Sequence, residues 1–556
     1  MNHLLGSWSV CFVSVLFCGL CILCAECGYV DGDTPVTART VERRHDGRKL
    51  KLVMSDEFEK GGRTFGPGED GVFEAVEKPD DSNQAMQFYN ASSRYVRTED
   101  GALVIETRAE RTTWRQWDAG KYQEAEFSKP YTSGMVQSWN KFCFTGGVLE
   151  LSVQLPGPWD SAGVWPAAWL MGNLARATFE TSTMDMWPWS YDRCGEMDHL
   201  GTKQEINACD KHPGHDLLPG HGRGAPEIDI FEVMPGHDMP FQGFVDGFVS
   251  TSLRIAPGIT KNEKKRHRPQ NGYRLNDTTL WYDGLRCGDG EFNWGFWGQM
   301  CGPEKDDTQE HIYKYQQDAL SMNTKLSKTH FEQQHIFRVE WQPGNQGYLD
   351  WYLDEEFLFG IDDWSLAQRT GATIPYEPMY FILNVAMSHQ WGFPEPCDVK
   401  NCDACYKNYD CTDPTAQCAL PKGLWNNCQN LPTQMKFDFV RLYQDSDDAS
   451  HTLGCSPKSY PTDAFIRAHS ERYANWAPHT APLLGRVQYW IMNPVGRTVS
   501  VLVLLIVITA GRHAHLAGWK VPGVSVWGWQ SREEARVRER RAGSAGAPTE
   551  ETGLLA

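Results

Sequence analysis

The chain has 556 residues, of which 41% are hydrophobic and 22% charged, and a formal net charge of −18 at pH 7. This composition is that of a globular protein, and the length allows one large domain or several ordinary ones. The negative charge argues against nucleic acid or an anionic membrane surface as the main partner and suits a neutral or weakly charged ligand. The chain also contains 22 Trp, whose rings can pack a core or stack against sugar rings; composition leaves both interpretations open.

The N-terminus carries an apolar run at residues 8–25, and no Lys or Arg precedes it. The run predicts a secretory signal peptide over residues 1–27. An uncleaved signal anchor is the competing prediction, because the basic residues that usually open a signal peptide are missing. Residues 28–49 are polar and predict a linker, so the folded domain is expected to begin at residue 50.

From residue 51 onward, short segments of alternating apolar and polar residues are separated by Gly, Pro, Asn and Asp. Period-two alternation over strand-sized lengths dominates, and long helical periods are scarce. We therefore expect an all-β domain over residues 50–447, built as a β-sandwich of the jelly-roll type. That span is large for one sandwich, so long loop insertions are expected at 181–224, 260–325 and 397–431.

Three carboxylates lie within the six residues 227–232, and the other three positions hold large apolar side chains. The apolar spacers predict a β-strand, on which alternate residues share a face. Glu227 and Asp229 then point the same way, whereas Glu232 has the wrong parity. A β-bulge at residues 230–231 would return Glu232 to the same face.

Repulsion among so many carboxylates raises a pKa and lowers stability, so such a cluster usually has a function. Two glutamates separated by two strand steps can give the ~5–5.5 Å carboxyl separation of retaining glycosidases. The alternative interpretation is a solvated acidic strand edge.

Twelve of the 17 cysteines lie within residues 143–455, and six of these fall in residues 397–428. The even number predicts disulfides in an oxidising compartment, with the 397–428 insertion stapled by them. A metal knuckle is the alternative, because residues 402–405 have CxxC spacing. Sequons at Asn90 and Asn276 predict N-glycosylation and agree with that compartment.

The C-terminal part predicts a juxtamembrane segment at 448–486, a transmembrane helix at 487–511 and a cytosolic tail at 512–556. The apolar run is short and reaches the ~20 residues of a span only when it is extended upstream across Arg497. Basic residues after the run place the tail in the cytosol. We therefore expect a membrane protein of the secretory pathway (endoplasmic reticulum, Golgi or plasma membrane), with its folded domain lumenal or extracellular.

The surroundings of the acidic stretch resemble glycoside hydrolase family 16. The matching segments occur in the order of that family: KLVMSDEF at 51–58, GVWPAAWL at 163–170, HIFRVEW at 335–341 and PMYFILN at 378–384. A closer resemblance is to one branch, the β-glucan synthesis-associated proteins known from fungal cell-wall assembly. It is carried by GRTFGPGED at 62–70, SGMVQSWNKFCFTGG at 133–147, MGNLARA at 171–177, MWPWSYD at 186–192, YQQDALS at 315–321 and CSPKSYPT at 455–462.

The resemblance implies a concanavalin-like jelly roll and assigns a role to each acid. Glu227 would be the nucleophile that forms a glycosyl-enzyme intermediate. Glu232 would be the general acid and then the general base. Asp229 would lie between them, hydrogen-bond Glu227 and tune both pKa values. Fungal members typically have an N-terminal anchor, so their topology does not carry over to this chain.

Four further residues are candidates for binding substrate: Trp165, Trp187, His335 and Asn384. On a regular strand Trp165 and Trp169 would share a face, but the intervening Pro166 breaks regularity. We therefore expect Trp165 to line the cleft and Trp169 to lie in the core. Trp187 would be a sugar platform in an aromatic loop.

The expected function is that of a membrane-tethered retaining glycosidase or transglycosylase in β-1,6-/β-1,3-glucan biosynthesis or cell-wall glucan remodelling. Its expected partners are β-glucan, the membrane through one C-terminal span, and a glucan synthase complex, with no nucleic acid. Neither a cofactor nor a metal ion is expected, since no acidic loop offers a convincing ligand set. The alternative is a non-catalytic glucan-binding or scaffold component of the glucan synthesis machinery; the three retained acids favour the enzyme.

Overall fold

The computed structural model divides the chain into two compact units, one formed by Met1–Trp114 and Glu126–Ala477 and the other by Arg115–Ala125 and Pro478–Ala556. The structure describes residues 28–118, 120–121, 123–161, 163–184, 186–189, 192, 206–207, 212–241, 244–254, 285–287, 291–292, 319–364, 366, 372–388, 410–412 and 428–476. The signal peptide, the span at 487–511, the cytosolic tail and Asn276 therefore lie outside the described residues.

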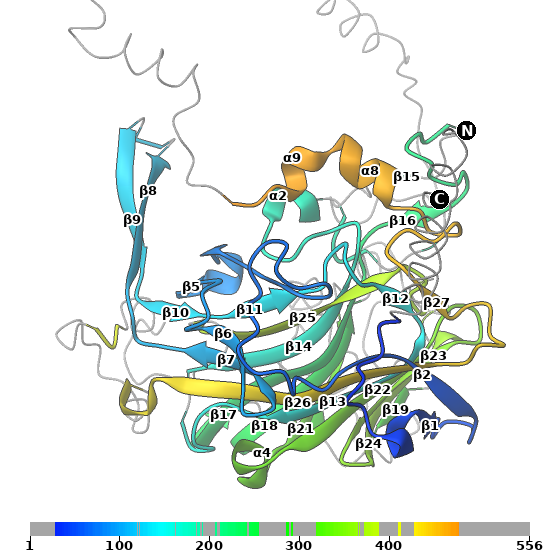
Figure 1. Cartoon of the computed structure of the whole chain (residues 1–556), viewed down its shortest axis with the longest axis horizontal. Coiled ribbons are helices and arrows are strands. Elements are labelled where there is room, and N and C mark those ends of the chain that lie inside the picture. The colour runs from blue at the N-terminus through cyan, green and yellow to red at the C-terminus, as the bar shows by residue number, and fades with distance from the viewer. Residues whose placement is uncertain are drawn as a thin grey trace, which may run out of the picture. The chain divides into compact units, whose positions relative to one another are not determined.

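Ten antiparallel strands form the first sheet, which lies in the larger unit (Figure 1). Their order is β1 (Thr40–Glu42), β2 (Lys49–Asp56), β26 (Thr433–Gln444), β13 (Gly147–Gln154), β22 (His335–Gln342), β23 (Tyr348–Leu353), β24 (Glu356–Asp362) and β19 (Leu285–Cys287), with β7 (Ala102–Thr107) beside β26 and β6 (Val96–Glu99) beside β7.

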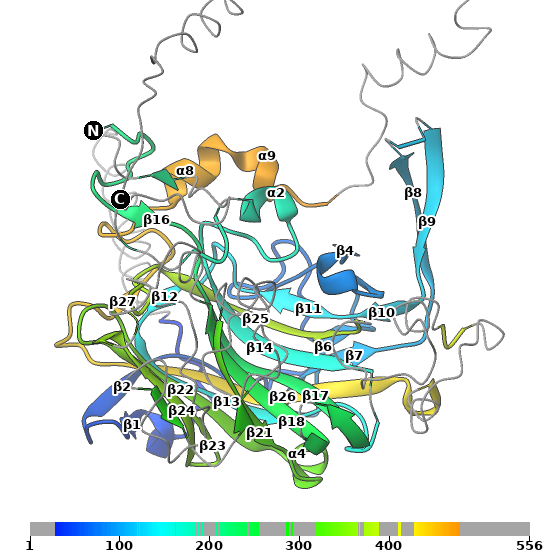
Figure 2. The same cartoon turned by 180° about the vertical axis from the view of Figure 1, so that it is seen from behind.

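Ten more antiparallel strands form the second sheet, whose strands β14, β17 and β18 are seen side by side in Figure 2. The order is β20 (Glu291–Phe292), β21 (Ala319–Lys325), β18 (Phe244–Arg254), β17 (Glu227–Phe241), β14 (Trp165–Gly172), β25 (Met379–Ala386), β11 (Met135–Gln137) and β3 (Glu74–Ala75), with β12 (Phe144–Thr145) beside β25 and β27 (Thr452–Leu453) beside β12. Neighbouring strands such as β14 and β25 are far apart in sequence, as expected for a jelly roll.

The other described elements belong to neither of the two large sheets. Three short strands form a separate sheet and two pairs of strands stand alone, whereas every helix within the described residues is short. These elements are β4 (Lys78–Pro79), β5 (Gln87–Tyr89), β10 (Tyr131–Ser133), the pair β8 (Thr112–Asp118) and β9 (Gln123–Lys129), the pair β15 (Ile206–Asn207) and β16 (Gly222–Arg223), the 3-10 helices η1 (Val36–Ala38) and η2 (Ser82–Gln84), and the α-helices α2 (Glu180–Thr183), α4 (Thr329–Glu332), α8 (Asp463–Ala468) and α9 (Ser470–Tyr473).

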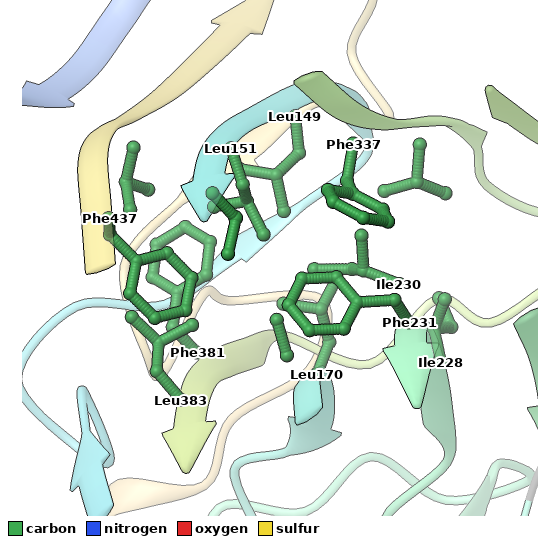
Figure 3. Packing of buried hydrophobic residues seen from close by; sticks show 14 of the residues in the cluster. Leu149, Leu151, Leu170, Ile228, Ile230, Phe231, Phe337, Phe381, Leu383 and Phe437 are labelled. Carbon is green, nitrogen blue, oxygen red and sulfur yellow. The ribbon is translucent and has the colours of Figure 1, made fainter. Parts of the chain in front are cut away.

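The main hydrophobic core lies between the two sheets. Figure 3 shows side chains from both sheets meeting there, with Leu151 and Phe337 on the first and Leu170 and Ile228 on the second. Period-two alternation puts one face of each strand into this core and leaves the opposite face for other contacts. The all-β sandwich expected from the sequence is therefore confirmed.

Residues 28–49 do not form the expected linker. Within them β1 pairs with β2, and the side chains of Thr34 and Arg43 are buried. The polar composition misled the prediction, because these polar side chains form hydrogen bonds with residues of the folded domain. Thr34 donates to Glu57 at 2.8 Å, and Arg43 donates to Gln342 at 2.8 Å. The folded domain thus begins upstream of residue 50.

The expected juxtamembrane segment also belongs to the folded domain, at least to residue 476. The Cys143–Cys455 disulfide and the pairing of β27 with β12 attach it to the second sheet. Farther on, α8 and α9 lie beside α2 (Figure 1), and Tyr473 is buried. The sequence predicted a juxtamembrane segment because most of its residues are polar.

A second disulfide, Cys411–Cys428, supports the prediction of a stapled 397–428 insertion for the few residues described there. No helix within the described residues is long and apolar enough to cross a membrane.

Candidate active site

The acidic stretch forms the start of β17, and the predicted bulge is present. Against β14, Asp229 pairs with Trp169 and Phe231 pairs with Ala168, so Ile230 is the inserted residue. Against β18 the register also shifts between Asp229 and Glu232. Because of this extra residue, Glu232 shares a face with the two acids that precede it.

Burial of the bulge residues explains why the strand adopts this shape. Ile228, Ile230 and Phe231 all enter the main core (Figure 3), which a regular strand would not allow for adjacent residues. The first sheet also fixes the backbone, since the indole N–H of buried Trp351 on β23 donates to the carbonyl oxygen of Asp229 at 2.9 Å. The three acids, each at most 5% exposed, face away from this core.

Glu227 is held at both carboxylate oxygens. The indole N–H of Trp187 donates to its Oε2, and the Arg254 guanidinium lies 3.3 Å from its Oε1. The guanidinium is also 5.9 Å from the centre of the Trp187 ring. Glu227 is thus a positioned carboxylate with a cation to balance its charge.

The loop that carries Trp187 is fastened to the chain that enters β17. The backbone N–H of Ala225 donates to the carbonyl of Met186 at 2.8 Å. At Gly224 a side chain has no room, because a Cβ atom would lie 2.3 Å from the Cβ of Trp189. This close approach sets where Trp187 meets the acids.

Asp229 lies between the two glutamates and accepts a hydrogen bond from the Ser252 hydroxyl of β18. Burial raises the pKa of Asp229 well above its ordinary value, and the charges of Glu227 and Glu232 raise it further. Its closest cation is more distant than that of Glu227, since Arg254 Nε is 4.0 Å from its Oδ2. Burial and the two flanking charges therefore favour the protonated form of Asp229.

Glu232 has a different environment from Glu227. Burial raises its pKa to about 7, with Arg254 opposing and Glu227 adding to the shift. Its Oε2 is buried, and the nearby Trp165 side chain also opposes the rise in pKa. A buried carboxyl group with a pKa near neutrality suits proton transfer.

Trp165, Trp169 and Asn384 all reach the face that carries the acids. The register between β14 and β25 runs unbroken through Pro166, so both tryptophans lie on this face, each half-buried. Trp169 shares this face with Trp165 and also packs there against a second cluster of buried hydrophobic residues, in line with its predicted place in a core. The Trp169 indole donates to Asn384 Oδ1 at 2.9 Å, and Asn384 donates to the Tyr89 hydroxyl at 3.1 Å.

His335 is the predicted site residue that the structure does not bring to the acids. It opens β22 of the first sheet, where its ring meets Asp354 and stacks on His330. The sequence predicts this strand correctly. Side-chain alternation along a strand does not show which of the two sheets the strand joins, so it could not place His335 relative to the acids. Asn90 follows β5 and is half-buried, and its glycosylation stays a prediction.

Three residues of the site are not predicted by the sequence: Arg254, Ser252 and Trp351. Positions 250, 252 and 254 are polar and share one face of a strand, but Thr251 between them is polar too, so alternation alone does not mark Arg254 or Ser252. No local signal marks Trp351, which contacts β17 from the opposite sheet.

Comparison with known families gives one match over more than half of the chain. Residues 20–280, 301–401 and 421–481 match the model of the family described as beta-glucan synthesis-associated protein SKN1/KRE6/Sbg1.

Two curated fungal relatives match along a similar stretch. The chain is 30% identical over 470 residues to the beta-glucan synthesis-associated protein SKN1 of Saccharomyces cerevisiae, covering 80% of this chain and 50% of that protein. It is 29% identical over 472 residues to the protein KRE6 of Candida albicans, covering 80% of this chain and 52% of that protein. The chain thus spans about half the length of the curated relatives it matches.

Among solved structures, the endo-beta-1,3-glucanase of Pyrococcus furiosus is similar with a TM-score of 0.39 and 18% identity, over 74% of this chain and 98% of that chain.

Proposed function

The chain belongs to the family of β-glucan synthesis-associated proteins, the branch of glycoside hydrolase family 16 that its motifs indicated, and from this membership we propose that it is a retaining glycosidase or transglycosylase acting on β-glucan. Its role would be in β-1,6-/β-1,3-glucan biosynthesis or in remodelling of cell-wall glucan. The observation that carries this proposal is the difference between the two glutamates that share one face of the second sheet.

In the proposed reaction Glu227 attacks the anomeric carbon, the bond to the departing oxygen breaks, and a glycosyl-enzyme intermediate forms. Glu232 gives its proton to the departing oxygen and then takes a proton from the acceptor. The contacts of Trp187 and Arg254 support Glu227 as nucleophile, because they fix a charged carboxylate. The raised pKa of Glu232 supports it as the acid.

Water as acceptor gives hydrolysis, whereas a sugar hydroxyl gives transfer with retention. A role in glucan assembly favours transfer, which needs an acceptor site that excludes water. We propose that the half-buried Trp165 and Trp169 and their neighbour Asn384 form part of the sugar-binding surface, since they lie on the same face as the acids.

The decisive experiment incubates the purified full-length chain with laminari-oligosaccharides and analyses the products. Longer or branched products indicate transfer, and shorter ones indicate hydrolysis. Glu227→Gln should abolish both, whereas the surface variant Glu99→Gln should leave them unchanged. Product profiles that are the same for the wild type and Glu227→Gln would rule out the enzyme and favour a non-catalytic glucan-binding or scaffold component.

We further propose that the domain is lumenal or extracellular and is tethered by a single span at residues 487–511 to a membrane of the secretory pathway. The described disulfides and the apolar C-terminal run support this topology. In sealed microsomes, protease should remove a tag placed at the C-terminus; a tag that survives would contradict a cytosolic tail.

A further inference from the structure

A compact cluster of two histidines and an aspartate lies where the chain crosses between the sheets. After β21 of the second sheet, α4 carries His330, and the chain then enters β22 of the first sheet at His335. Asp354 comes from the turn between β23 and β24. The three side chains bring nitrogen and oxygen atoms that can bind a metal to within 4.8 Å of one another.

Each imidazole is oriented through its Nδ1 atom. Nδ1 of His335 contacts Asp354 Oδ2, and the other oxygen of Asp354 accepts from the backbone N–H of Ile336 at 2.9 Å. Nδ1 of His330 lies 3.1 Å from the carbonyl oxygen of Ser327. For His335, the tautomer that donates from Nδ1 to Asp354 presents the lone pair of Nε2. Nδ1 of His330 also receives the backbone N–H of Ser327 at 3.1 Å, so a metal at Nε2 of His330 requires the tautomer in which Nδ1 donates to the Ser327 carbonyl.

The Nε2 atom of one of the two rings lacks the partner that a buried nitrogen normally has. Nε2 of His335 is buried and receives no hydrogen bond from the part of the chain that the structure describes. The two rings are stacked, with centroids 4.0 Å apart and planes 24° from parallel.

We propose that His330 and His335 bind a divalent cation of the zinc type through their Nε2 atoms, with Asp354 as the group that orients His335. A histidine ligand that donates its other ring N–H to a carboxylate or a backbone carbonyl is the usual arrangement around bound zinc. Two imidazoles favour zinc over calcium or magnesium, which prefer oxygen ligands.

The ligand atoms need only a small adjustment to bind. Zinc–nitrogen bonds of ~2.0–2.1 Å in a tetrahedral site place ligand atoms about 3.3 Å apart. The side chains must therefore rotate to bring the ligand atoms closer than the 4.8 Å within which the atoms of the cluster lie, and water would fill the remaining positions. The rings cannot form such a site by stacking alone, so binding should change their relative tilt.

Zinc binding is expected to stabilise the folded domain. The backbone N–H of Leu155 on the segment after β13 donates to the carbonyl of His330 at 2.9 Å, and Phe331 is buried in the main core. A bound cation would therefore link the crossover between the sheets to the β23–β24 turn. The proposed catalytic acids lie on the second sheet, whereas His335 of the cluster lies at the start of β22 in the first sheet. Activity is therefore not expected to depend on zinc.

The test measures zinc content and thermal unfolding of the full-length chain after removal of metal and re-addition of ZnSO4. The wild type should bind zinc and unfold at a higher temperature when zinc is present, because a ligand that binds only the native state stabilises it. His335→Gln keeps a donor for Asp354 but removes Nε2, so it should bind one zinc fewer and lose the shift. The matched control His45→Gln changes a histidine that pairs with Asp350 and should behave as the wild type.

Two further measurements keep the test decisive. Asp354→Asn should weaken zinc binding by about 10–100-fold, the usual effect of losing an orienting carboxylate. If His335→Gln does not fold, cobalt added to the wild type should give a spectrum without thiolate bands, and thiolate bands would place the metal at cysteines instead. Equal zinc content and equal thermal shift in the wild type and His335→Gln would overturn the proposal.

Discussion

The indole N–H of Trp187 donates a hydrogen bond to the carboxylate of Glu227, while the Trp187 ring itself is 36% exposed. One side chain therefore both fixes the proposed nucleophile and presents an aromatic face to solvent. These two functions can be separated by substitution.

Trp187→Phe keeps an aromatic face but removes the N–H. A hydrogen bond to a charged group contributes roughly 1.5–3 kcal/mol, so kcat should fall at least about tenfold while KM changes little. Trp187→Ala also removes the sugar platform and should raise KM. Steady-state kinetics on laminari-oligosaccharides measure both effects, with Trp364→Phe as the control because Trp364 is an exposed tryptophan on another segment. Wild-type kcat in Trp187→Phe would contradict the first effect.

The pKa of Glu232 predicts the alkaline side of the pH profile. Burial raises this pKa to about 7, and the general acid must be protonated in order to act. Activity should therefore fall about tenfold per pH unit above roughly pH 7. Glu232→Gln should lower kcat by about 10²–10⁴-fold and remove this limb from any residual activity. An alkaline limb that persists unchanged in Glu232→Gln would assign it to another group.

The same pKa shift predicts that buried Glu232 lowers the free energy of unfolding at alkaline pH. Glu232 has a folded pKa near 7 against an ordinary value of 4.5. Between about pH 4.5 and pH 7, Glu232 is ionised in the unfolded chain but protonated in the folded chain. Its contribution to the free energy of unfolding is therefore full below about pH 4.5 and is lost as the pH rises to about 7. Glu232→Gln should therefore stabilise the chain by up to roughly 3 kcal/mol at pH 8 and by little at pH 4.5.

Chemical denaturation at the two pH values measures this difference. Glu340→Gln is the matched control, because Glu340 is equally buried but is paired with Arg338 and accepts from the backbone N–H of Arg44 at 2.7 Å. Its loss should destabilise the chain at both pH values. Destabilisation by Glu232→Gln at pH 8 would show that the site does not lower stability.

Asp229 should tolerate an amide better than it tolerates removal. Its pKa is raised well above the ordinary value by burial and by both glutamates, so the neutral side chain resembles Asn. Asp229→Asn should keep the contact with Ser252 and retain measurable activity, whereas Asp229→Ala leaves a buried hydroxyl without its acceptor and should lose about 10-fold more. Equal activities of the two variants would argue against a protonated Asp229.

The acidic strand was predictable because its signal is local. Parity alone showed that Glu232 needed a bulge, and the registers of β17 with β14 and β18 confirm one. Arg254 and Trp351 were not predictable in the same way. Their contacts with β17 come from a neighbouring strand and from the opposite sheet, so they depend on strand order, which alternation within one strand does not encode.

The predicted domain boundaries were wrong for a related reason. Composition marks a segment as polar, but it does not show that the polar groups find partners in the fold. Arg43 in the supposed linker is 5% exposed, and Thr462 in the supposed juxtamembrane segment is fully buried. Both are hydrogen-bonded, to Gln342 and to Asn173, and each of these partners is far away in sequence.

The last prediction concerns the end of the folded domain. A chain that ends at residue 447 lacks the Cys143–Cys455 disulfide, and it also lacks Tyr473, whose hydroxyl donates to the carbonyl of Leu174 at 2.6 Å and whose ring stacks on Trp139. The disulfide alone contributes about 2–5 kcal/mol, a large part of the ~5–15 kcal/mol stability of a typical domain. This chain should therefore fail to fold.

A chain that ends at residue 477 should fold and unfold cooperatively, since it keeps every contact of α8 and α9 with the domain. Cys455→Ser in that longer chain separates the disulfide from the packing and should lower the free energy of unfolding by about 2–5 kcal/mol while leaving a folded protein. Because Leu174 and the residues after it lead to the loop of Trp187, activity should be lost with the segment as well. A chain ending at 447 that resists proteolysis and unfolds cooperatively would show that residues 448–476 are an appendage rather than part of the domain.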